Sequence, residues 1–429
     1  MPMKPLLAYF LVVLSLFPLQ SSACSMYKYT VAGKTWVGNN EDSWGTDPMI
    51  WFVPGDSKKL GLVCLGYQRK FPNPDGAMNS AGLAFDAFTM PHRSNLAQRN
   101  PQMEDFSYSK LQTIMQSCKT VEEVYHYFQN KNLQVLNGSA LFPGSMLLFV
   151  DKSGKYLVVE AHQLSFGNES NFALANFSYA DTKDRSLVNM ERYRKGISFM
   201  NRHLPEATLS YAKLLSDTMS VNREKAGDGT LYTNLFNLET GEIHLFFFHD
   251  FSKRISFKLD EELAKGAHHL AFSNLFPDNS GFKKFTSYHT PQTQRYMFYL
   301  LLLLGIFLIL CAIRLASYAT KAKPVSYSIS VLLFALFGFL MGIYCFILVR
   351  NPGICYFPSP YEDAHSGFVS SFSYLPYLSI PVCVASAFFV FQFIKTSPIK
   401  TSFKGLLIGN QVCIFVLCCL FMYWRLLSF

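Results

Sequence analysis

Cys24 follows three small residues, Ser21-Ser22-Ala23, an arrangement typical of the point at which a signal peptidase cuts. Cleavage before Cys24 would place a thiol and a free α-amine on the same residue. An α-amine has a reference pKa of about 7.7–8.0, so part of it is unprotonated near neutral pH and can accept the proton of the thiol. One residue would then hold both a nucleophile and a base, the pairing that covalent catalysis requires.

The residues before Cys24 have the three parts of a secretory signal. Lys4 supplies the positive start, the apolar run 6–17 is too short to span a membrane comfortably, and Pro18 ends that run. We therefore predict that residues 1–23 are a signal peptide. Two alternatives remain open, namely an uncleaved anchor helix and a lipoprotein cysteine whose acylated amine could no longer act as a base.

Three further polar residues could complete such a site. The carboxylate of Asp42 follows a strand-like stretch and could orient the amine and the thiol. The amide of Asn176 ends an apolar run and could donate to an oxyanion. The guanidinium of Arg192 could lower the pKa of the thiol. Each residue also has an ordinary interpretation, as a turn residue, a surface loop residue or part of a solvated helix face.

The order of these residues resembles that of the N-terminal-nucleophile cysteine amidases, which include choloylglycine hydrolases, penicillin V acylases and acid ceramidase-like enzymes. The resemblance covers the chain from Cys24 to about Leu259. It rests on Cys24-Ser25, GNNED at 38–42, MNSAGLA at 78–84, FVDKSGKYLVVE at 149–160, LANF at 174–177, SLVNMERYR at 186–194 and TLYTNLFNLETGEIHLFF at 230–247. Members of this group fold as an αββα sandwich and hydrolyse linear amides.

The resemblance implies a role for each matching residue. Cys24 corresponds to the nucleophile and base, Asp42 to the partner of its amine and thiol, and Arg192 to the arginine near the thiol. Asn176 corresponds to a side-chain oxyanion donor, and the backbone N–H of Thr89 to a second one. We expect no cofactor, and the histidines show no spacing typical of a metal site.

Two asparagines are candidates for substrate binding. Asn79 lies in the MNSAGLA stretch, and Asn39 stands where the family usually has an arginine, three residues before the aspartate. The missing charge leaves the substrate preference open. It also favours an alternative of another class, a non-catalytic membrane receptor or scaffold built on an amidase fold.

Strand pairs with covering helices are expected between residues 24 and 265, which predicts an α+β fold with the αββα layering. The expected strands are 27–37, 145–151, 155–162, 231–238 and 242–249, and the expected helices are 108–130 and 182–200. Apolar side chains near the first strands are candidates either for an acyl pocket or for the core, namely Ile50, Trp51, Phe52, Phe85 and Phe88. A disulfide between Cys64 and Cys118 is left open.

A second domain is expected at 295–429, after a linker at 266–294. Four apolar runs there reach the length of a membrane helix, at about 296–313, 325–349, 374–394 and 405–424. The loops after the first and third runs are the most basic, which by the positive-inside rule places them in the cytoplasm. The amidase domain would then lie on the extracytoplasmic side, in the periplasm if the source is bacterial.

The net charge of +9 is spread along the chain without a basic block, so we expect no nucleic-acid partner. The expected partners are the bilayer and a small or lipid-like N-acyl amide. We therefore predict a membrane-anchored amidase that cleaves a linear C–N bond through a thioester on Cys24. The same thioester could be taken by an amine instead of water, which leaves an acyltransferase as an alternative.

Overall fold

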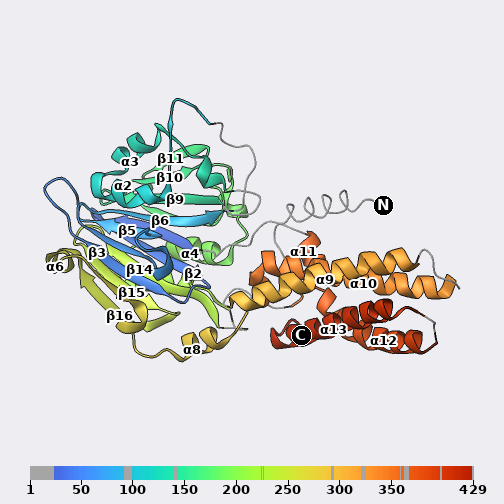
Figure 1. Cartoon of the computed structure of the whole chain (residues 1–429). Helices are drawn as coiled ribbons and strands as arrows, with labels where there is room; N and C mark the ends of the chain where they lie inside the picture. The colour runs from blue at the N-terminus through green and yellow to red at the C-terminus, as the bar shows by residue number, and fades with distance from the viewer. Residues whose placement is uncertain are drawn as a thin grey trace. The chain divides into compact units, whose positions relative to one another are not determined.

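The computed structural model describes residues 24–90, 99–138, 144–223, 225, 227–290, 294–319, 325–357, 359–361, 367–396 and 399–427. The chain divides into two compact units, one of sheets and helices that ends at Ser287 and one of long helices that follows it (Figure 1). The predicted signal peptide, residues 1–23, lies outside the described residues.

The first unit contains two antiparallel sheets. One sheet has the order β12-β1-β2-β14-β15-β16, with β13 added beside β14. Its strands are β1 Ser25–Val31, β2 Lys34–Ser43, β12 Asn171–Ala175, β13 Asn222–Arg223, β14 Asp228–Asn237, β15 Glu242–Phe247 and β16 Asp250–Lys258. The middle strands β2 and β14 are buried along almost their whole length, which agrees with a sheet covered on both faces.

The second sheet has the order β11-β10-β9-β6-β5-β4-β3-β17. Its strands are β3 Pro48–Val53, β4 Leu62–Tyr67, β5 Gly76–Asn79, β6 Leu83–Met90, β9 Gly144–Asp151, β10 Tyr156–Glu160, β11 Gln163–Gly167 and β17 His268–Ala271. A separate parallel pair is formed by β7 Glu104–Asp105 and β8 Lys131–Asn132. The two main sheets meet at several points, for example where Tyr67 of β4 donates a hydrogen bond to Glu41 of β2.

Helices cover the outer face of each sheet. The helices α4 Glu191–Arg202 and α5 Leu209–Met219 pack on the first sheet through a core that includes Tyr27, Tyr193 and Leu215. The helices α2 Leu111–Ser117 and α3 Val121–Phe128 pack on the second sheet. The predicted αββα sandwich is therefore confirmed, and Figure 1 shows the two sheets between their helices.

The first predicted strand, 27–37, is in fact a hairpin of β1 and β2. The chain reverses at Ala32 and Gly33, whose φ angles of 50° and 75° place both residues in the left-handed region. Such a two-residue turn matches the twist of antiparallel strands. Beyond it, Gly38 lies under the ring of Tyr27, where a Cβ would come within 2.3 Å of the ring. Tyr27 can therefore cross β2 and donate to the carbonyl of Ala212 on α5.

The two later hairpins are confirmed as β9–β10 and β14–β15. The predicted helix 108–130 is broken after α2, because the chain turns extended at Cys118 and Thr120 then caps α3 by accepting from the N–H of Glu123. The predicted helix 182–200 begins only at Glu191. Its first part holds a single short turn, Arg185–Leu187, capped by the side chain of Asp184.

The predicted linker 266–294 is ordered in most of its length. The strand β17 joins β3 at the edge of the second sheet, and the helices α7 Phe272–Leu275 and α8 Ser280–Ser287 follow it. Aromatic contacts hold this segment against the sheets, since Phe272 packs against Tyr232 and Phe282 packs against Phe247. The short helix α6 Leu259–Ala264 precedes this segment.

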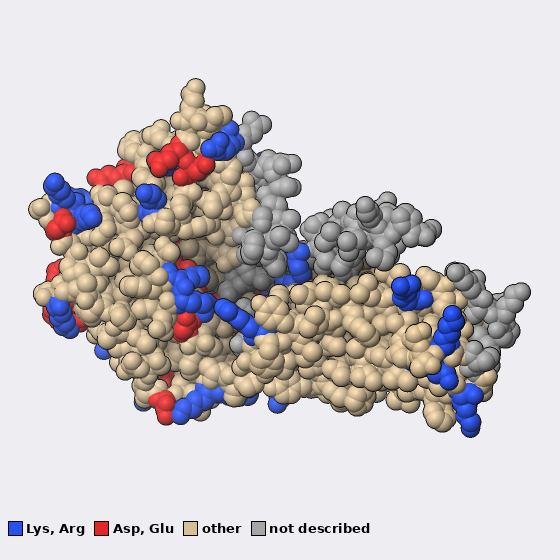
Figure 2. Space-filling model, viewed as in Figure 1, with Lys and Arg blue, Asp and Glu red and all other residues tan. Residues whose placement is uncertain are grey.

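The second unit contains four helices long and apolar enough to cross a membrane, as predicted. Its helices are α9 Arg295–Ala319, α10 Val325–Arg350, α11 Gly367–Phe372, α12 Leu375–Thr396 and α13 Thr401–Tyr423. A polar contact joins two of them, because Ser386 of α12 donates to the side-chain oxygen of Gln411 on α13. Figure 2 shows basic side chains gathered toward one end of this unit. In the sequence, Lys395 lies in the last turn of α12, and Lys400 directly precedes α13.

Candidate active site

Cys24 lies between two polar residues because three neighbouring strands are in register. Ser25 pairs with Ala175 of β12 on one side and with Asn40 of β2 on the other. One residue earlier, Cys24 is therefore level with Asn176 and with Glu41. Its thiol is 3% exposed and donates a hydrogen bond of 2.9 Å to the Oε2 atom of Glu41.

Glu41 was not predicted as a site residue, and its surroundings favour the protonated form. Its other oxygen, Oε1, accepts a hydrogen bond of 2.9 Å from the hydroxyl of Tyr67. Burial, followed by the charge of Asp75, raises the pKa of Glu41 to about 7, although Cys24, Lys70 and Tyr67 act in the opposite direction. A carboxyl group that titrates near neutral pH can both accept and return a proton under ordinary conditions.

A second buried carboxyl group lies near this pair. Asp86 of β6 is 3% exposed, and its Oδ1 atom has no hydrogen-bond partner. Burial and the nearby carboxyl groups of Glu41 and Asp75 raise the pKa of Asp86 well above its ordinary value. The pKa of the Cys24 thiol is raised too, first by burial and then by the charges of Glu41 and Asp86. These effects favour the neutral thiol, which then needs a base. The influence of Arg192 on the thiol stays a prediction.

Asp42 lies on the other face of β2 from Glu41, because consecutive strand residues point to opposite faces. Its Oδ1 atom accepts a hydrogen bond of 2.6 Å from Thr230, and its Oδ2 atom is 3.9 Å from the Nε atom of Arg192. Burial raises the pKa of Asp42 to about 6 against the opposing effect of Arg192. Asp42 thus lies close to the site, but the side chain that holds the thiol is that of Glu41.

Asn176, Thr89 and Arg192 are brought together from distant parts of the chain. The amide nitrogen of Asn176 donates to the carbonyl of Thr89 over 2.7 Å, and its oxygen accepts from Arg192 over 2.8 Å. Arg192 therefore bridges Asn176 and Asp42, and burial lowers its pKa. Thr89 takes one of the two N–H donors that a side-chain amide carries. The two predicted oxyanion donors are neighbours beside Cys24.

The two predicted substrate contacts lie elsewhere. Asn79 donates to the carbonyls of Met115 and Cys118 and accepts from the N–H groups of Ala81 and Leu83, all within 3.0 Å. The side chain of Asn79 thus holds together backbone groups of the fold, and its role in substrate binding stays a prediction.

Asn39 is 1% exposed within the first sheet, and its amide lies 3.5 Å from the side-chain oxygen of Asn234. It does not line the cleft at Cys24. The substrate contact of Asn39 therefore also stays a prediction.

An open cleft of about 540 Å³ gives access to Cys24. It is bordered by aromatic and charged side chains and is the right size for a small-molecule substrate. Its lining includes Cys24, Glu41, Tyr67, Arg69, Lys70, Phe71, Asp75, Phe88, Thr89, Tyr108 and Leu111. Of the five apolar residues considered for an acyl pocket only Phe88 lines this cleft, while Trp51 and Phe85 belong to the core under α2 and α3.

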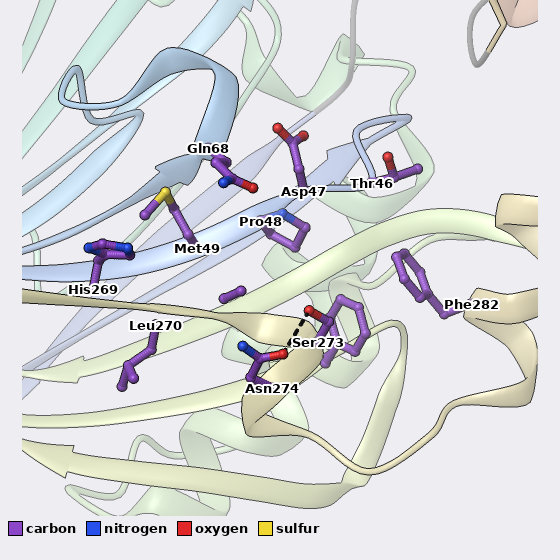
Figure 3. A pocket seen from close by; sticks show the side chains of 12 residues that line it. Thr46, Asp47, Pro48, Met49, Gln68, His269, Leu270, Ser273, Asn274 and Phe282 are labelled. Atoms are coloured by element: carbon purple, nitrogen blue, oxygen red, sulfur yellow. Dashed lines mark hydrogen bonds between the residues drawn. The ribbon is translucent and has the colours of Figure 1, made fainter.

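A second cavity of about 440 Å³ lies beside β3, β17 and α7 (Figure 3). Its polar residues include Asp47, which forms an ion pair with Arg69 of the Cys24 cleft. None of the residues that line it is a cysteine. Cys64 and Cys118, for which a disulfide was left open, are both free and buried.

Sequence reasoning missed Glu41 and Tyr67, although one signal was present. A two-residue turn at Ala32 and Gly33 fixes the pairing of the strands on either side of it and sets Cys24 opposite Glu41. For Tyr67 the sequence holds no such signal, since it reaches Glu41 from the other sheet.

Comparison with solved structures finds many similar folds, among them the following three. Two are variants of the conjugated bile acid hydrolase of Clostridium perfringens, each 16% identical over 60% of this chain, covering 99% and 97% of that protein with TM-scores of 0.49 and 0.46. The third is penicillin V acylase from Agrobacterium tumefaciens, 12% identical over 59% of this chain and 92% of that protein, with a TM-score of 0.42. No family model and no curated protein matches the chain.

Proposed function

We propose that this protein is a membrane-anchored cysteine amidase that hydrolyses an N-acyl amide through a thioester on Cys24. The observation that carries the proposal is the row of side chains formed by β12, β1 and β2. It sets the thiol of Cys24 between the Asn176 amide and the Glu41 carboxyl group, at the edge of an open cleft. A nucleophile with an oxyanion donor beside it is the central arrangement that acyl transfer needs.

In this reaction the sulfur of Cys24 attacks the amide carbon, and the amine leaves. Water then attacks the thioester and releases the acid. The negative oxygen of each tetrahedral intermediate is stabilised by the side chain of Asn176 and the backbone N–H of Thr89. Arg192 holds Asn176 in place through the hydrogen bond to its oxygen, which leaves the amide nitrogen directed toward Thr89.

The proposed substrate is a lipid-like N-acyl amide. The cleft at Cys24 combines apolar side chains such as Phe88 and Leu111, which suit an acyl chain, with charged side chains such as Lys70 and Asp75, which suit a polar head group. The four apolar helices of the same chain would keep the enzyme at a bilayer, where such substrates are concentrated. The basic loops of the helical unit support an extracytoplasmic position for the amidase unit.

The test uses the full-length protein in detergent. Intact mass establishes whether the chain begins at Cys24, and a panel of N-acyl amides with different chain lengths is then tested for release of amine. We expect Cys24→Ala to abolish turnover and Cys64→Ala, a second buried free cysteine outside the cleft, to retain it. Equal turnover in the Cys24→Ala variant would refute the proposal. Hydroxylamine added to the assay forms a hydroxamate if the thioester transfers its acyl group to amines.

One observation favours a non-catalytic binding protein as the second candidate. Asn39 stands at the position of the family arginine, and its amide lies inside the sheet rather than beside the thiol. A scaffold would retain ligand binding in the cleft in the Cys24→Ala variant while neither form releases amine.

A further inference from the structure

The Cys24 cleft contains a carboxyl group that the chemistry described above does not require. In an N-terminal cysteine amidase the expected base is the α-amine, which would be freed by cleavage before Cys24. In this structure the thiol instead points at Glu41, with the sulfur 2.9 Å from Oε2. Both groups are almost fully buried, at 3% and 6% exposed, so this contact is not an incidental surface contact.

We propose that Glu41 is a catalytic residue, which takes the proton of the Cys24 thiol and passes it to the departing amine. This inference rests on the proposed amidase function. It names a proton carrier other than the α-amine, and it assigns Tyr67 as the residue that positions the carboxyl group.

Tyr67 fixes which oxygen of Glu41 faces the sulfur. Its hydroxyl donates to Oε1 over 2.9 Å, which leaves Oε2 directed at Cys24. Glu41 comes from the first sheet and Tyr67 from the second, so the contact holds the carboxyl group at the junction of the sheets. A proton acceptor needs this kind of support, because proton transfer requires an oxygen within hydrogen-bond reach of the donor.

The groups that act on Glu41 set its proton affinity near neutrality. Among the described residues the titratable side chains that interact with it are Cys24, Tyr67, Lys70, Asp75, Asp86 and Tyr232. Burial and Asp75 favour the neutral carboxyl group, while Lys70 and the two hydrogen bonds favour the carboxylate. This balance suits a group that must accept a proton in one step and donate it in the next.

The proton balance closes over both halves of the reaction. In acylation the thiol proton moves to Glu41, a C–S bond forms, and the C–N bond breaks as nitrogen takes its electron pair and the proton from Glu41. In deacylation water gives a proton to Glu41 while its oxygen attacks the thioester. The C–S bond then breaks, and the sulfur recovers that proton. After acylation the thiol proton has left with the amine and Glu41 is an unprotonated carboxylate. After deacylation the proton supplied by water restores the starting state, in which the two residues share a single proton.

The first experiment compares two substrates with the same acyl chain, lauroyl p-nitroanilide and p-nitrophenyl laurate, on the full-length protein. The anilide needs a proton on its leaving group and the nitrophenolate does not. We expect Glu41→Gln to lower kcat/KM for both substrates, because both need the thiol deprotonated. The fall should be about 10-fold to 100-fold larger for the anilide, which also loses its proton donor. An equal fall on both substrates, as a structural role would give, or no fall on either, overturns the inference.

The matched control is Glu160→Gln. Glu160 is equally buried, at 5% exposed, but it accepts from the N–H of Ala180 and lies outside the cleft. We expect its kinetics to equal those of the wild type. If it loses activity in parallel with Glu41→Gln, the loss comes from altered folding and the assignment of Glu41 fails.

A second measurement needs no substrate. Iodoacetamide alkylation of Cys24, followed by mass spectrometry of the peptide that contains it, is measured from pH 5 to 9. If the two groups share one proton, the rate in the wild type rises to a plateau with a midpoint near pH 7, and in Glu41→Gln it continues to rise. Identical profiles overturn the pairing. A wild type that hydrolyses neither substrate but shows the plateau would refute the amidase function instead.

Discussion

Glu41 and Asp42 are consecutive residues of β2, and the two faces of that strand use them differently. Glu41 points between the sheets, where its neighbours are a thiol, a tyrosine and two further carboxyl groups. Asp42 points toward the helices, where Thr230 and Arg192 are its partners. Both carboxyl groups are buried, and burial raises the pKa of both.

The difference lies in what surrounds the charge. Asp42 has a cation beside it, so its ionised form is part of the folded structure. Glu41 is surrounded mainly by acidic and neutral groups. Ionising it in the folded protein therefore costs free energy and lowers the stability of the fold. Residues kept under such conditions are more often found at functional sites than in ordinary cores. The two faces of one strand thus place one carboxyl group beside a cation and the other beside a thiol.

The largest effect that tests this contrast is expected from Asp42→Ala. It leaves the buried guanidinium of Arg192 without its carboxylate, and breaking a buried pair in this way costs about 3–5 kcal/mol. The thermal transition of the full chain, followed by tryptophan fluorescence at pH 7.5, should fall by about 10 °C. The double variant Asp42→Ala/Arg192→Met should recover part of the lost stability. If its transition temperature falls by the sum of the falls of the two single variants, the pairing of Asp42 with Arg192 is contradicted.

Glu41→Gln should raise, rather than lower, the stability of the folded protein at high pH. The rise of its pKa from 4.5 to about 7 means that the folded state binds the proton more tightly than the unfolded state. Its stabilising contribution is therefore present below pH 4.5 and is lost as the pH rises through 7, by about 3 kcal/mol at about 1.4 kcal/mol per pH unit. Glu41→Gln should melt at a higher temperature than the wild type at pH 8 and not at pH 5.

Thr230→Val should have a smaller effect, of about 2 kcal/mol, because it removes a hydrogen bond to a buried carboxylate. The matched control is Thr233→Val, whose hydroxyl donates over 2.7 Å to the neutral side chain of Asn40. A hydrogen bond between neutral groups contributes about 1 kcal/mol. Equal losses in the two variants, measured from thermal transitions at pH 7.5, would show that the charge of Asp42 matters little.

The smallest expected effect is that of Tyr67→Phe. The tyrosine hydroxyl stabilises the carboxylate of Glu41, so its loss should raise the pKa of Glu41 by about 1 unit or less. The midpoint of the Cys24 alkylation profile should then move above pH 7. A midpoint that stays in place or moves down would mean that Tyr67 does not hold Glu41.

Much of the fold could be predicted because it depends on local pattern. The four apolar helices were found from length and composition, and the hairpins at 152–154 and 239–241 from turn residues between apolar runs. The regular structure after Gly266 was not predicted, because β17 forms only by pairing with β3 at the edge of the second sheet. No property of its own sequence distinguishes it from a linker.

The site was predicted less completely for a similar reason. Cys24, Asp42, Asn176, Thr89 and Arg192 come close together as expected, but their roles remain predictions. Glu41 was passed over for its neighbour because a shift of one residue along a strand exchanges the two faces of the sheet. If the turn at Ala32 and Gly33 had been recognised from the sequence, it would have shown that the Cys24 thiol lies on the same face of the sheet as Glu41.

That turn also determines the order in which the site is assembled. Cys24 and Glu41 are separated by only 17 positions in the chain, whereas Asn176 and Thr89 are 87 apart and Thr230 and Asp42 are 188 apart. Contacts that are close in sequence form sooner, and the N-terminal part of a chain leaves the ribosome first. The thiol and its carboxyl partner are therefore adjacent long before β12 and β14 have been synthesised. The complete site can therefore form only after β14 has been synthesised.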